Sequence, residues 1–387
     1  MKKTVSLAAI FIVLISTPVR SQLAMGKWRT HLAYNNVSEI EQSDNKVYAV
    51  SEGSLYSIDK LDRNIEFYSK ITGLNGYNIT RIGFDSTNKQ LVIAYANGNI
   101  DIMGSGGVTN VPDLYNKQMS ANKGVNHILF SRNKAYLSCN FGILALNLQK
   151  KEISDTYFIG PNASEVKVLA TAVSNGNIYA LTPTALYEAP VNDPFLINYQ
   201  KWKTTGALPD SGVVKSIVSF AGKIFLHRGE RLYFLNNDNT WSAFLPELSV
   251  SGFSTSDGIM CIYSSNSVYI ADNQLNIKNI PNLSTISDAE YDTENSTYWF
   301  AANSNGVVTY KENGTSNPIK PAGPAVNMPW DMTFSGDKLF VVPGGRWSDQ
   351  NHNKGKVMMY EDGNWINIYG EDIQTVTGRN PLDFLNV

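Results

Sequence analysis

Two short basic stretches carry the side chains best suited to bind an anion or a sugar. The first comprises Arg346, Trp347, His352 and Lys354, and the second comprises Arg228 and Arg231. Arginine and lysine form charge-assisted hydrogen bonds with phosphate or carboxylate, and an indole can stack on a sugar face. We predict a ligand or partner site at these residues. The alternative is that both stretches are solvated turns or contacts with a neighbouring domain.

Residue spacings typical of catalysis or metal binding do not occur in the sequence. The four histidines, at positions 31, 127, 227 and 352, lie too far apart for metal-ligand spacing, and there is no phosphate-binding glycine loop or Gly-x-Ser-x-Gly elbow. We therefore predict no catalytic residue, no metal ligand and no cofactor. Residues 236–239, 303–306 and 361–364 are rich in Asn, Asp and Gly, which is typical of hairpin turns, and structural calcium is the alternative for them.

These stretches sit within a repeat that recurs about every forty residues. Each unit has an apolar first strand, an aromatic second strand, a tight turn and an aromatic third strand. The predicted second strands are 46–50, 90–95, 134–138, 177–181, 223–227, 258–262, 297–301 and 338–342. The predicted first strands begin at 37, 79, 125, 166, 213, 253, 289 and 330, with spacings of 42, 46, 41, 47, 40, 36 and 41 residues.

This period predicts an all-β fold, a β-propeller of four-stranded antiparallel blades with seven blades or eight. A lone aromatic segment, 26–33, precedes the first hairpin and resembles the predicted fourth strands 201–203, 240–244 and 364–368. We expect it to close the last blade of the ring, because propellers pair their free edge in this way.

The predicted domain boundaries follow from the same count. Residues 1–21 are expected to be a signal peptide, 22–328 the N-terminal β-propeller, and 329–387 one or more further blades that start a second propeller in a truncated chain. Insertions are expected between the third and fourth strands at 103–122 and 189–199. The basic loop 343–355 is a long turn between second and third strands, on the face where propellers usually bind ligands.

The N-terminus and the overall charge restrict location and partners. Lys2 and Lys3 precede an apolar run at 5–15 and small residues before Gln22, which is typical of a secretory signal. The run is short for a membrane-spanning helix, so no transmembrane segment is expected in the mature chain. Removal of the signal leaves 29 basic and 34 acidic side chains, which does not favour nucleic-acid binding.

The two cysteines, Cys139 and Cys261, fall in predicted second strands of the third and sixth units. Several blades would separate them, and a disulfide needs Cα atoms within about 7 Å. Both are therefore predicted to be buried free thiols.

Several segments resemble the N-terminal β-propeller of the PorZ family, surface components of the type IX secretion system of Bacteroidetes. The resemblance is dense between Trp28 and Ala170 and is carried by 28–31, 68–74, 93–101, 135–138, 141–143 and 152–160. Beyond Ala170 the sequence is similar to the general two-component-regulator propeller repeat. The resemblance implies two consecutive propellers and a C-terminal signal domain, no catalytic residues, and membership of the outer-membrane attachment complex that contains a sortase.

We therefore interpret the chain as a non-enzymatic scaffold or adaptor exported to the outer-membrane surface. Its expected partners are the sortase and other attachment-complex proteins, together with anionic lipopolysaccharide. The alternative is the periplasmic glycan-sensing propeller of a hybrid two-component regulator, which would place it in the periplasm. A propeller lyase would need a cluster of catalytic side chains that the sequence lacks.

Overall fold

The computed structural model describes residues 28–209, 212–283, 285–314, 316–344 and 355–377. The chain divides into two compact units, residues 1–30 and 31–387, and every element below belongs to the second. Residues 1–27, which contain the expected signal peptide, lie outside the described residues. No helix among the described residues is long and apolar enough to cross a membrane.

The fold is all-β, with eight antiparallel sheets that are each built from four consecutive strands. The strands of the first four sheets are β1 (Val37–Gln42), β2 (Lys46–Ser51), β3 (Ser54–Asp59), β4 (Ile65–Tyr68); β5 (Ile79–Asp85), β6 (Gln90–Tyr95), β7 (Ile100–Gly104), β8 (Gly107–Val111); β9 (Val125–Ser131), β10 (Lys134–Cys139), β11 (Gly142–Asn147), β12 (Glu152–Tyr157); and β13 (Ala170–Ser174), β14 (Asn177–Leu181), β15 (Leu186–Pro190), β16 (Lys203–Thr204). This arrangement agrees with the predicted β-propeller architecture.

The other four sheets repeat the same order. Their strands are β17 (Val214–Phe220), β18 (Lys223–Arg228), β19 (Arg231–Leu235), β20 (Trp241–Phe244); β21 (Gly252–Ser256), β22 (Ile259–Tyr263), β23 (Ser267–Ala271), β24 (Ile277–Pro281); β25 (Asp288–Asp292), β26 (Thr297–Ala301), β27 (Val307–Lys311), β28 (Ser316–Ile319); and β29 (Asp331–Ser335), β30 (Lys338–Val342), β31 (Lys356–Glu361), β32 (Asn364–Tyr369). The predicted second strands at 90–95, 177–181, 297–301 and 338–342 are confirmed residue for residue.

Helical elements are short and lie in the connections. They are η1 (Lys70–Thr72), α1 (Asp113–Asn116), η2 (Pro161–Ala163), η3 (Tyr199–Lys201) and α2 (Gly370–Thr377).

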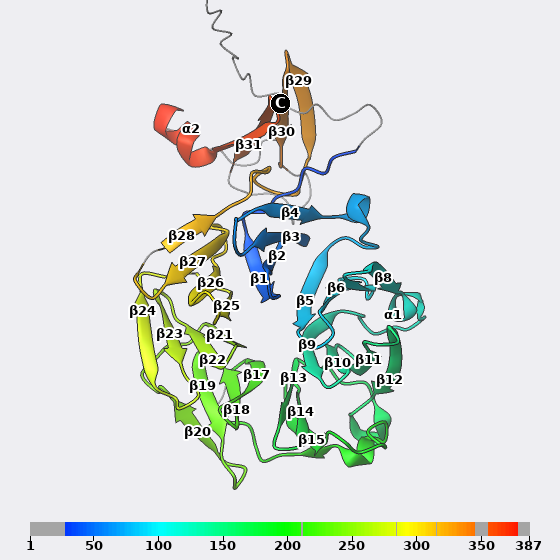
Figure 1. Cartoon of the computed structure of the whole chain (residues 1–387). Helices are drawn as coiled ribbons and strands as arrows, with labels where there is room; N and C mark the ends of the chain where they lie inside the picture. The colour runs from blue at the N-terminus through cyan, green and yellow to red at the C-terminus, as the bar shows by residue number, and fades with distance from the viewer. Residues whose placement is uncertain (1–27, 210–211, 284, 315, 345–354, 378–387) are drawn as a thin grey trace, which may run out of the picture. The chain divides into compact units, whose positions relative to one another are not determined.

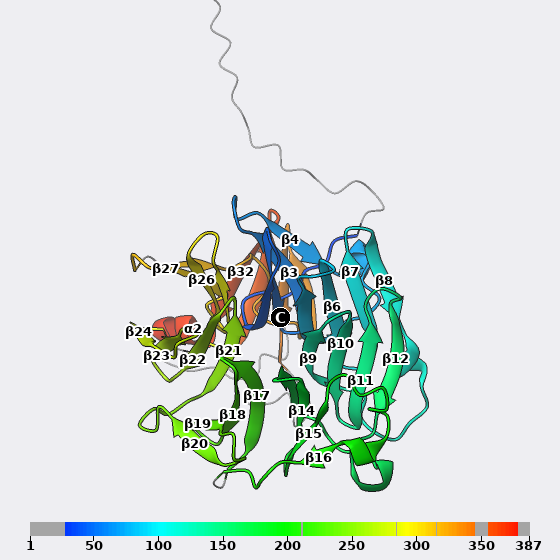
Figure 2. The same ribbon diagram turned by 60° about the horizontal axis from the view of Figure 1, so that its bottom comes forward.

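The first strands of seven sheets contact one another in a closed cycle. β1, β5, β9, β13, β17, β21 and β25 follow in chain order, and β25 returns to contact β1. Figure 1 shows these strands around a common centre, and Figure 2 shows β9, β17 and β21 inside and β8, β12 and β20 outside. The cycle closes where the Val37 amide donates to the Asn303 carbonyl at 3.1 Å.

The core lies between neighbouring sheets, so the middle strands are buried on both faces. Apolar side chains of β2, β3, β5 and β6 form one such layer, which includes Val50, Leu55 and Ile82. Another layer joins Trp299 and Val307 of the seventh sheet to Tyr56 of the first. A strand that is covered on both faces must be apolar at nearly every position, which explains the continuous apolar runs in the sequence.

A buried carboxylate fixes the second sheet to the connection that precedes it. Asp101 accepts hydrogen bonds from the Asn75 amide at 2.8 Å, the Tyr95 hydroxyl at 2.6 Å and the Asn110 side chain at 2.8 Å. The Asn75 side chain adds a fourth bond at 3.0 Å. These bonds compensate for burying the carboxylate.

The expected closing strand at 26–33 is not found. Residues 28–36 form no strand, and Gly26 and Lys27 lie outside the described residues. The seventh sheet supplies its own fourth strand, β28, so its outer edge is already paired. Residues 31–35 instead contact the connection between the seventh and eighth sheets, where the Ala33 amide donates to Asn327 Oδ1 at 2.6 Å.

Two further expectations are corrected in detail. The insertion at 103–122 does not separate third and fourth strands, because β8 follows β7 after a tight turn and the extra residues, with α1, come after it. The first strand expected from Val166 begins at Ala170. The insertion at 189–199 does lie between β15 and β16.

The Asn, Asp and Gly segments are hairpin turns, as interpreted from the sequence. Asn239, Asn303 and Asp362 have φ angles of 62°, 42° and 50°, in the left-handed region that Asn and Asp tolerate. Gly363, with φ of 82°, completes the turn between β31 and β32.

Candidate binding site

Of the site residues predicted from the sequence, Arg228 and Arg231 lie within the described part of the chain. Arg346, Trp347, His352 and Lys354 lie outside the described residues, so a site there stays a prediction. Arg228 and Arg231 lie at the two ends of the turn between β18 and β19. Arg228 donates from Nε to the Gly212 carbonyl at 3.0 Å and from Nη1 to the Pro209 carbonyl at 2.9 Å.

These bonds give Arg228 a structural role in holding the segment before β17. Arg231 is exposed and has no hydrogen-bond or ion-pair partner among the described residues. The neighbouring His227 is buried, and its Nε2 bonds to the Val250 carbonyl at 3.1 Å. Burial, together with Lys215, lowers the pKa of His227 to about 4. Arg231 could therefore meet a ligand without giving up an existing bond, and a ligand role for either arginine stays a prediction.

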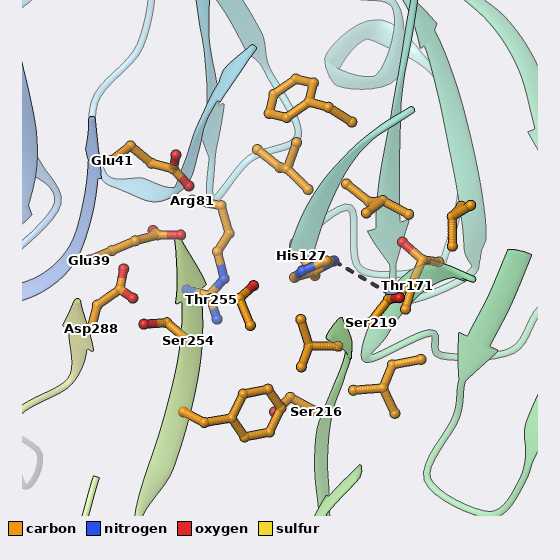
Figure 3. Close-up of a pocket in the computed structure, with 18 of the residues that line it drawn as sticks. Glu39, Glu41, Arg81, His127, Thr171, Ser216, Ser219, Ser254, Thr255 and Asp288 are labelled. Carbon is orange, nitrogen blue, oxygen red and sulfur yellow. Dashed lines mark hydrogen bonds between the residues drawn. The ribbon is translucent and has the colours of Figure 1, made fainter. Parts of the chain in front are cut away.

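A cavity of about 660 Å³ lies at the centre of the ring. Its walls come from the first strands of all seven sheets in the cycle. The polar lining residues are Glu39, Glu41, Arg81, Ser131, His127, Thr171, Ser216, Ser219, Ser254, Thr255, Asp288 and Glu290. Figure 3 shows the Arg81 side chain between Glu39 and Asp288 on one side and His127 on the other.

Carboxylates of one first strand accept hydrogen bonds from unpaired backbone amides of the neighbouring first strand. The Ile82 amide donates to Glu39 Oε2 at 3.3 Å, and the Phe84 amide donates to Glu41 Oε2 at 3.2 Å. The Ile40 amide donates in the same way to Asp288 Oδ2 at 3.0 Å. A first strand has a partner on one side only, so its remaining amide groups need other acceptors.

Neutral side chains repeat this arrangement on other sheets. The Tyr291 amide donates to Ser256 Oγ at 3.1 Å, and the Thr171 amide donates to His127 Nδ1 at 3.4 Å. A histidine that accepts at Nδ1 carries its proton on Nε2 when neutral. Burial, and secondarily Arg81, lowers the pKa of His127 to about 4, so the ring is neutral near pH 7.

The four acidic side chains that line the cavity have raised pKa values, so they stay protonated to unusually high pH. Burial raises the pKa of Glu39 to about 8 and that of Asp288 to about 6, and Arg81 partly opposes both shifts. Burial also raises the pKa of Glu290 to about 8, although its hydrogen bond from Ser256 opposes this. The pKa of Glu41 lies well above its usual range because of burial and then repulsion from Glu290.

Arg81 is the cation of this cavity, and the backbone holds it in place. Its Nε donates to the Asn126 carbonyl at 2.7 Å, and its Nη1 donates to the Thr80 carbonyl at 2.6 Å. It forms no ion pair with a carboxylate among the described residues, so part of the guanidinium faces the cavity. The cavity thus presents acceptors on one wall, a cation beside them and hydroxyl groups opposite.

This chemistry is suited to binding. His127 already accepts a backbone hydrogen bond, and no contact among the described residues joins it to Ser216 or Ser219, so a serine–histidine nucleophile is not formed there. No group of three His, Cys, Asp or Glu side chains in the described part of the chain could hold a metal ion.

Sequence reasoning did not find this cavity, although a signal was present. Glu39 and Glu41, and likewise Asp288 and Glu290, stand two residues apart in first strands. Alternate acidic residues are unexpected in a strand at the centre of a ring. His127 was noted only as one of four scattered histidines.

The cysteine prediction is confirmed, because Cys139 and Cys261 are buried and free. Burial raises the pKa of the Cys139 thiol to about 12 and that of Cys261 further. Both thiols are therefore protonated and unreactive in the folded chain.

Comparison with known proteins confirms the resemblance stated from the sequence. Residues 47–203 match the family model described as the PorZ N-terminal β-propeller domain of the type IX secretion system. A search of curated protein sequences finds no match.

Solved structures give the same result. PorZ of Porphyromonas gingivalis, described as an essential bacterial surface component of its type IX secretion system, aligns with a TM-score of 0.82 and 25% identity. The alignment covers 92% of this chain and 48% of that one, so this chain spans about half the length of that protein.

More distant structures share the fold alone. The extracellular domain of a hybrid two-component system of B. thetaiotaomicron aligns with a TM-score of 0.57 and 12% identity, over 86% of this chain and 51% of that one. YCF48 bound to D1 peptide aligns with a TM-score of 0.52 and 10% identity, over 75% of this chain and 96% of that one.

Proposed function

We propose that this chain is the N-terminal propeller region of a PorZ-type adaptor in a type IX secretion system. The observation that carries the proposal is the match of residues 47–203 to the PorZ propeller model, supported by the 0.82 TM-score with PorZ. The proposed role is non-enzymatic, as a scaffold of the outer-membrane attachment complex that works with the sortase. A cavity lined for binding, without an assembled nucleophile, is consistent with this role.

The domain organisation forms part of the proposal. The closed cycle of seven first strands supports a seven-bladed propeller within residues 22–328, after a cleaved signal at 1–21. The eighth sheet, within 329–387, is then the first blade of a second propeller.

The proposed location is the outer-membrane surface, and the proposed ligand is anionic lipopolysaccharide. Arg346, Trp347, His352 and Lys354 remain the proposed contact residues, with Arg231 as the free cation of the second stretch. The two-component sensor alternative rests on a likeness of 12% identity, which shows a shared fold and does not favour that function.

The test uses the full-length protein in its native host. Protease treatment of intact cells should digest it, and affinity purification should recover the sortase and lipopolysaccharide. The triple variant Arg346→Ala, Trp347→Ala and Lys354→Ala should retain at least tenfold less lipopolysaccharide, because charge-assisted and stacking contacts each contribute about 1 to 3 kcal/mol.

The control replaces three exposed residues elsewhere, Lys278→Ala, Lys311→Ala and Trp330→Ala. Protection of the protein in intact cells, with digestion only after lysis, would contradict a surface location and favour the periplasmic sensor. Equal lipopolysaccharide retention by the two triple variants would remove the loop from the proposal.

A further inference from the structure

A second cavity lies between the third and fourth sheets and differs in character from the central one. It measures about 410 Å³. One side is the turn between β9 and β10, and the other is the insertion between β15 and β16. Its lining residues are Ser131, Arg132, Asn133, Lys134, Tyr136, Asn147, Gln149, Asp155, Tyr157, Val191, Asn192, Asp193, Pro194, Leu196 and Ile197.

A buried tyrosine of this lining turns a hydroxyl without a hydrogen-bond partner among the described residues toward the cavity. Tyr136 is 5% exposed, and no hydrogen bond to its hydroxyl exists among the described residues. The oxygen reaches the cavity, because it is not among the side-chain atoms sealed from solvent without a partner. Such a hydroxyl is ready to donate to a ligand and to accept from it. Tyr157, beside it, is also nearly fully buried, at 3% exposed.

The charges of the cavity leave one cation without a counterion. Lys134 pairs with Asp155 at 3.2 Å, and Lys201 pairs with the lining residue Asp193 at 3.0 Å. Arg132 is exposed and forms no ion pair or hydrogen bond within the described part of the chain. Arg132 is therefore the lining cation that is available at the rim of the cavity, where it favours an anionic group.

The opposite wall is aliphatic and held firmly in place. Leu196 is buried, whereas Ile197 is 62% exposed. The buried Trp202 indole donates from Nε1 to the Leu196 carbonyl at 2.9 Å, and the Phe195 amide donates to Asp193 Oδ1 at 2.8 Å. A wall that is ordered before binding loses little conformational entropy when a ligand arrives.

We propose that this cavity binds a short acidic peptide segment of a partner protein. An Asp or Glu side chain of the segment pairs with Arg132, and an adjacent aliphatic side chain packs on Pro194 and Ile197. The Tyr136 hydroxyl and the side-chain amide of Asn133, which has no hydrogen bond among the described residues, bond to the peptide backbone. A saccharide is less well matched, because it stacks on open aromatic faces, and both tyrosine rings here are buried.

This inference goes beyond the proposed adaptor role and does not depend on lipopolysaccharide. The probes are capped hexapeptides that place Asp or Glu next to Val, Leu or Ile, with the matched Asn and Gln peptides as uncharged controls. Binding is followed by NMR of the full 387-residue chain labelled at isoleucine methyl groups, because Ile197 reports directly on the cavity.

Acidic peptides should shift the Ile197 methyl signal and bind at least tenfold more tightly than their amide controls. Arg132→Met should remove that preference, and Tyr136→Phe should weaken binding severalfold, whereas the exposed control Lys278→Met should change nothing. Arg132→Met leaves the buried floor intact, so the outcome does not depend on a damaged fold.

Three results would overturn the proposal. These are no binding by any acidic peptide, equal binding by the amide peptides, or binding that Arg132→Met leaves unchanged. A shift of Ile197 with glucuronate and none with peptides would reassign the cavity to a saccharide. Failure of the parent protein to retain lipopolysaccharide, with acidic-peptide binding intact, would instead contradict the proposed ligand alone.

Discussion

Carboxylates of the central cavity have two roles that conflict. Glu39 must accept the Ile82 amide, which fixes its position at the edge of β5. There the carboxylate is half-buried at the cavity wall and close to Asp288, so its ionised form is disfavoured and its pKa is raised. Interactions that bind one sheet to the next therefore also place proton-binding groups around Arg81.

Unfolding should depend on pH through Glu39. Its pKa rises from an ordinary value of 4.5 to about 8, so the folded chain binds the extra proton between these values. The free energy of unfolding should therefore fall as pH rises from 5 to 8. Glu39→Gln keeps a carbonyl acceptor for Ile82 and removes this titration, so the variant should be more stable than the parent at pH 8, by about 1 kcal/mol, and nearly equal at pH 5.

Urea unfolding at the two pH values measures this difference. Glu165→Gln, at an exposed position, serves as the control and should follow the parent at both. An equal loss of stability at pH 5 and pH 8 in Glu39→Gln would show that only the hydrogen bond matters.

At the scale of elements, the insertion between β15 and β16 is built as a rigid wall. Leu196 and Trp202 enter the core shared by the third and fourth sheets. Phe195 and Ile197, on either side of Leu196, stay exposed. The loop thus alternates anchoring and exposed side chains, which is the arrangement expected of a surface kept for contact with a partner.

Trp202→Phe should loosen this wall. The change removes the indole N–H and leaves the Leu196 carbonyl without its buried donor, at a cost of about 1 to 3 kcal/mol. Urea unfolding should show the loss, and limited proteolysis should cut more quickly within 191–201. Trp330→Phe, at a tryptophan that is 41% exposed, is the control. Unchanged stability and cleavage in Trp202→Phe would mean that packing alone holds the loop.

At the scale of the whole molecule, Asn327 joins three segments that lie far apart in the sequence. Its Oδ1 accepts from the Ala33 amide at 2.6 Å, and its Nδ2 donates to Ser54 Oγ at 3.4 Å. The backbone amide of Asn327 donates to Glu52 Oε2 at 3.3 Å. Nearby, the Trp365 indole donates to His31 Nδ1 at 3.0 Å, so residues 31–33 contact the eighth sheet directly.

Asn327→Ala should weaken the connection between the seventh and eighth sheets. Loss of the side-chain bonds leaves the Ala33 amide unpaired, and we expect a loss of about 1 to 2 kcal/mol. Calorimetry should resolve an earlier transition for the eighth sheet, and proteolysis should be faster within 321–330. Asn305→Ala, in an exposed turn, should behave as the parent. A single unchanged transition would show that apolar packing around Val341 and Met358 is sufficient.

The sequence by itself determined the repeat, most strand positions, the turn chemistry and the free cysteines. These features depend on local patterns: aromatic runs buried on both faces, and Asn or Gly at positive φ. The closing strand expected at 26–33 was mispredicted because it, too, was inferred from a local pattern. Trp28 and its neighbours resemble a fourth strand locally, but β28 already occupies that edge.

Only the tertiary structure decided where the binding chemistry lies. Glu39, Arg81, His127 and Asp288 come from four different sheets and meet because the first strands contact one another in a closed cycle. The local pattern predicted a ligand role for Arg228, and only the fold shows that its guanidinium also bonds to the Gly212 carbonyl. Side chains that converge across a ring are separated by many residues, and nothing in their local sequence specifies which of them will share a cavity.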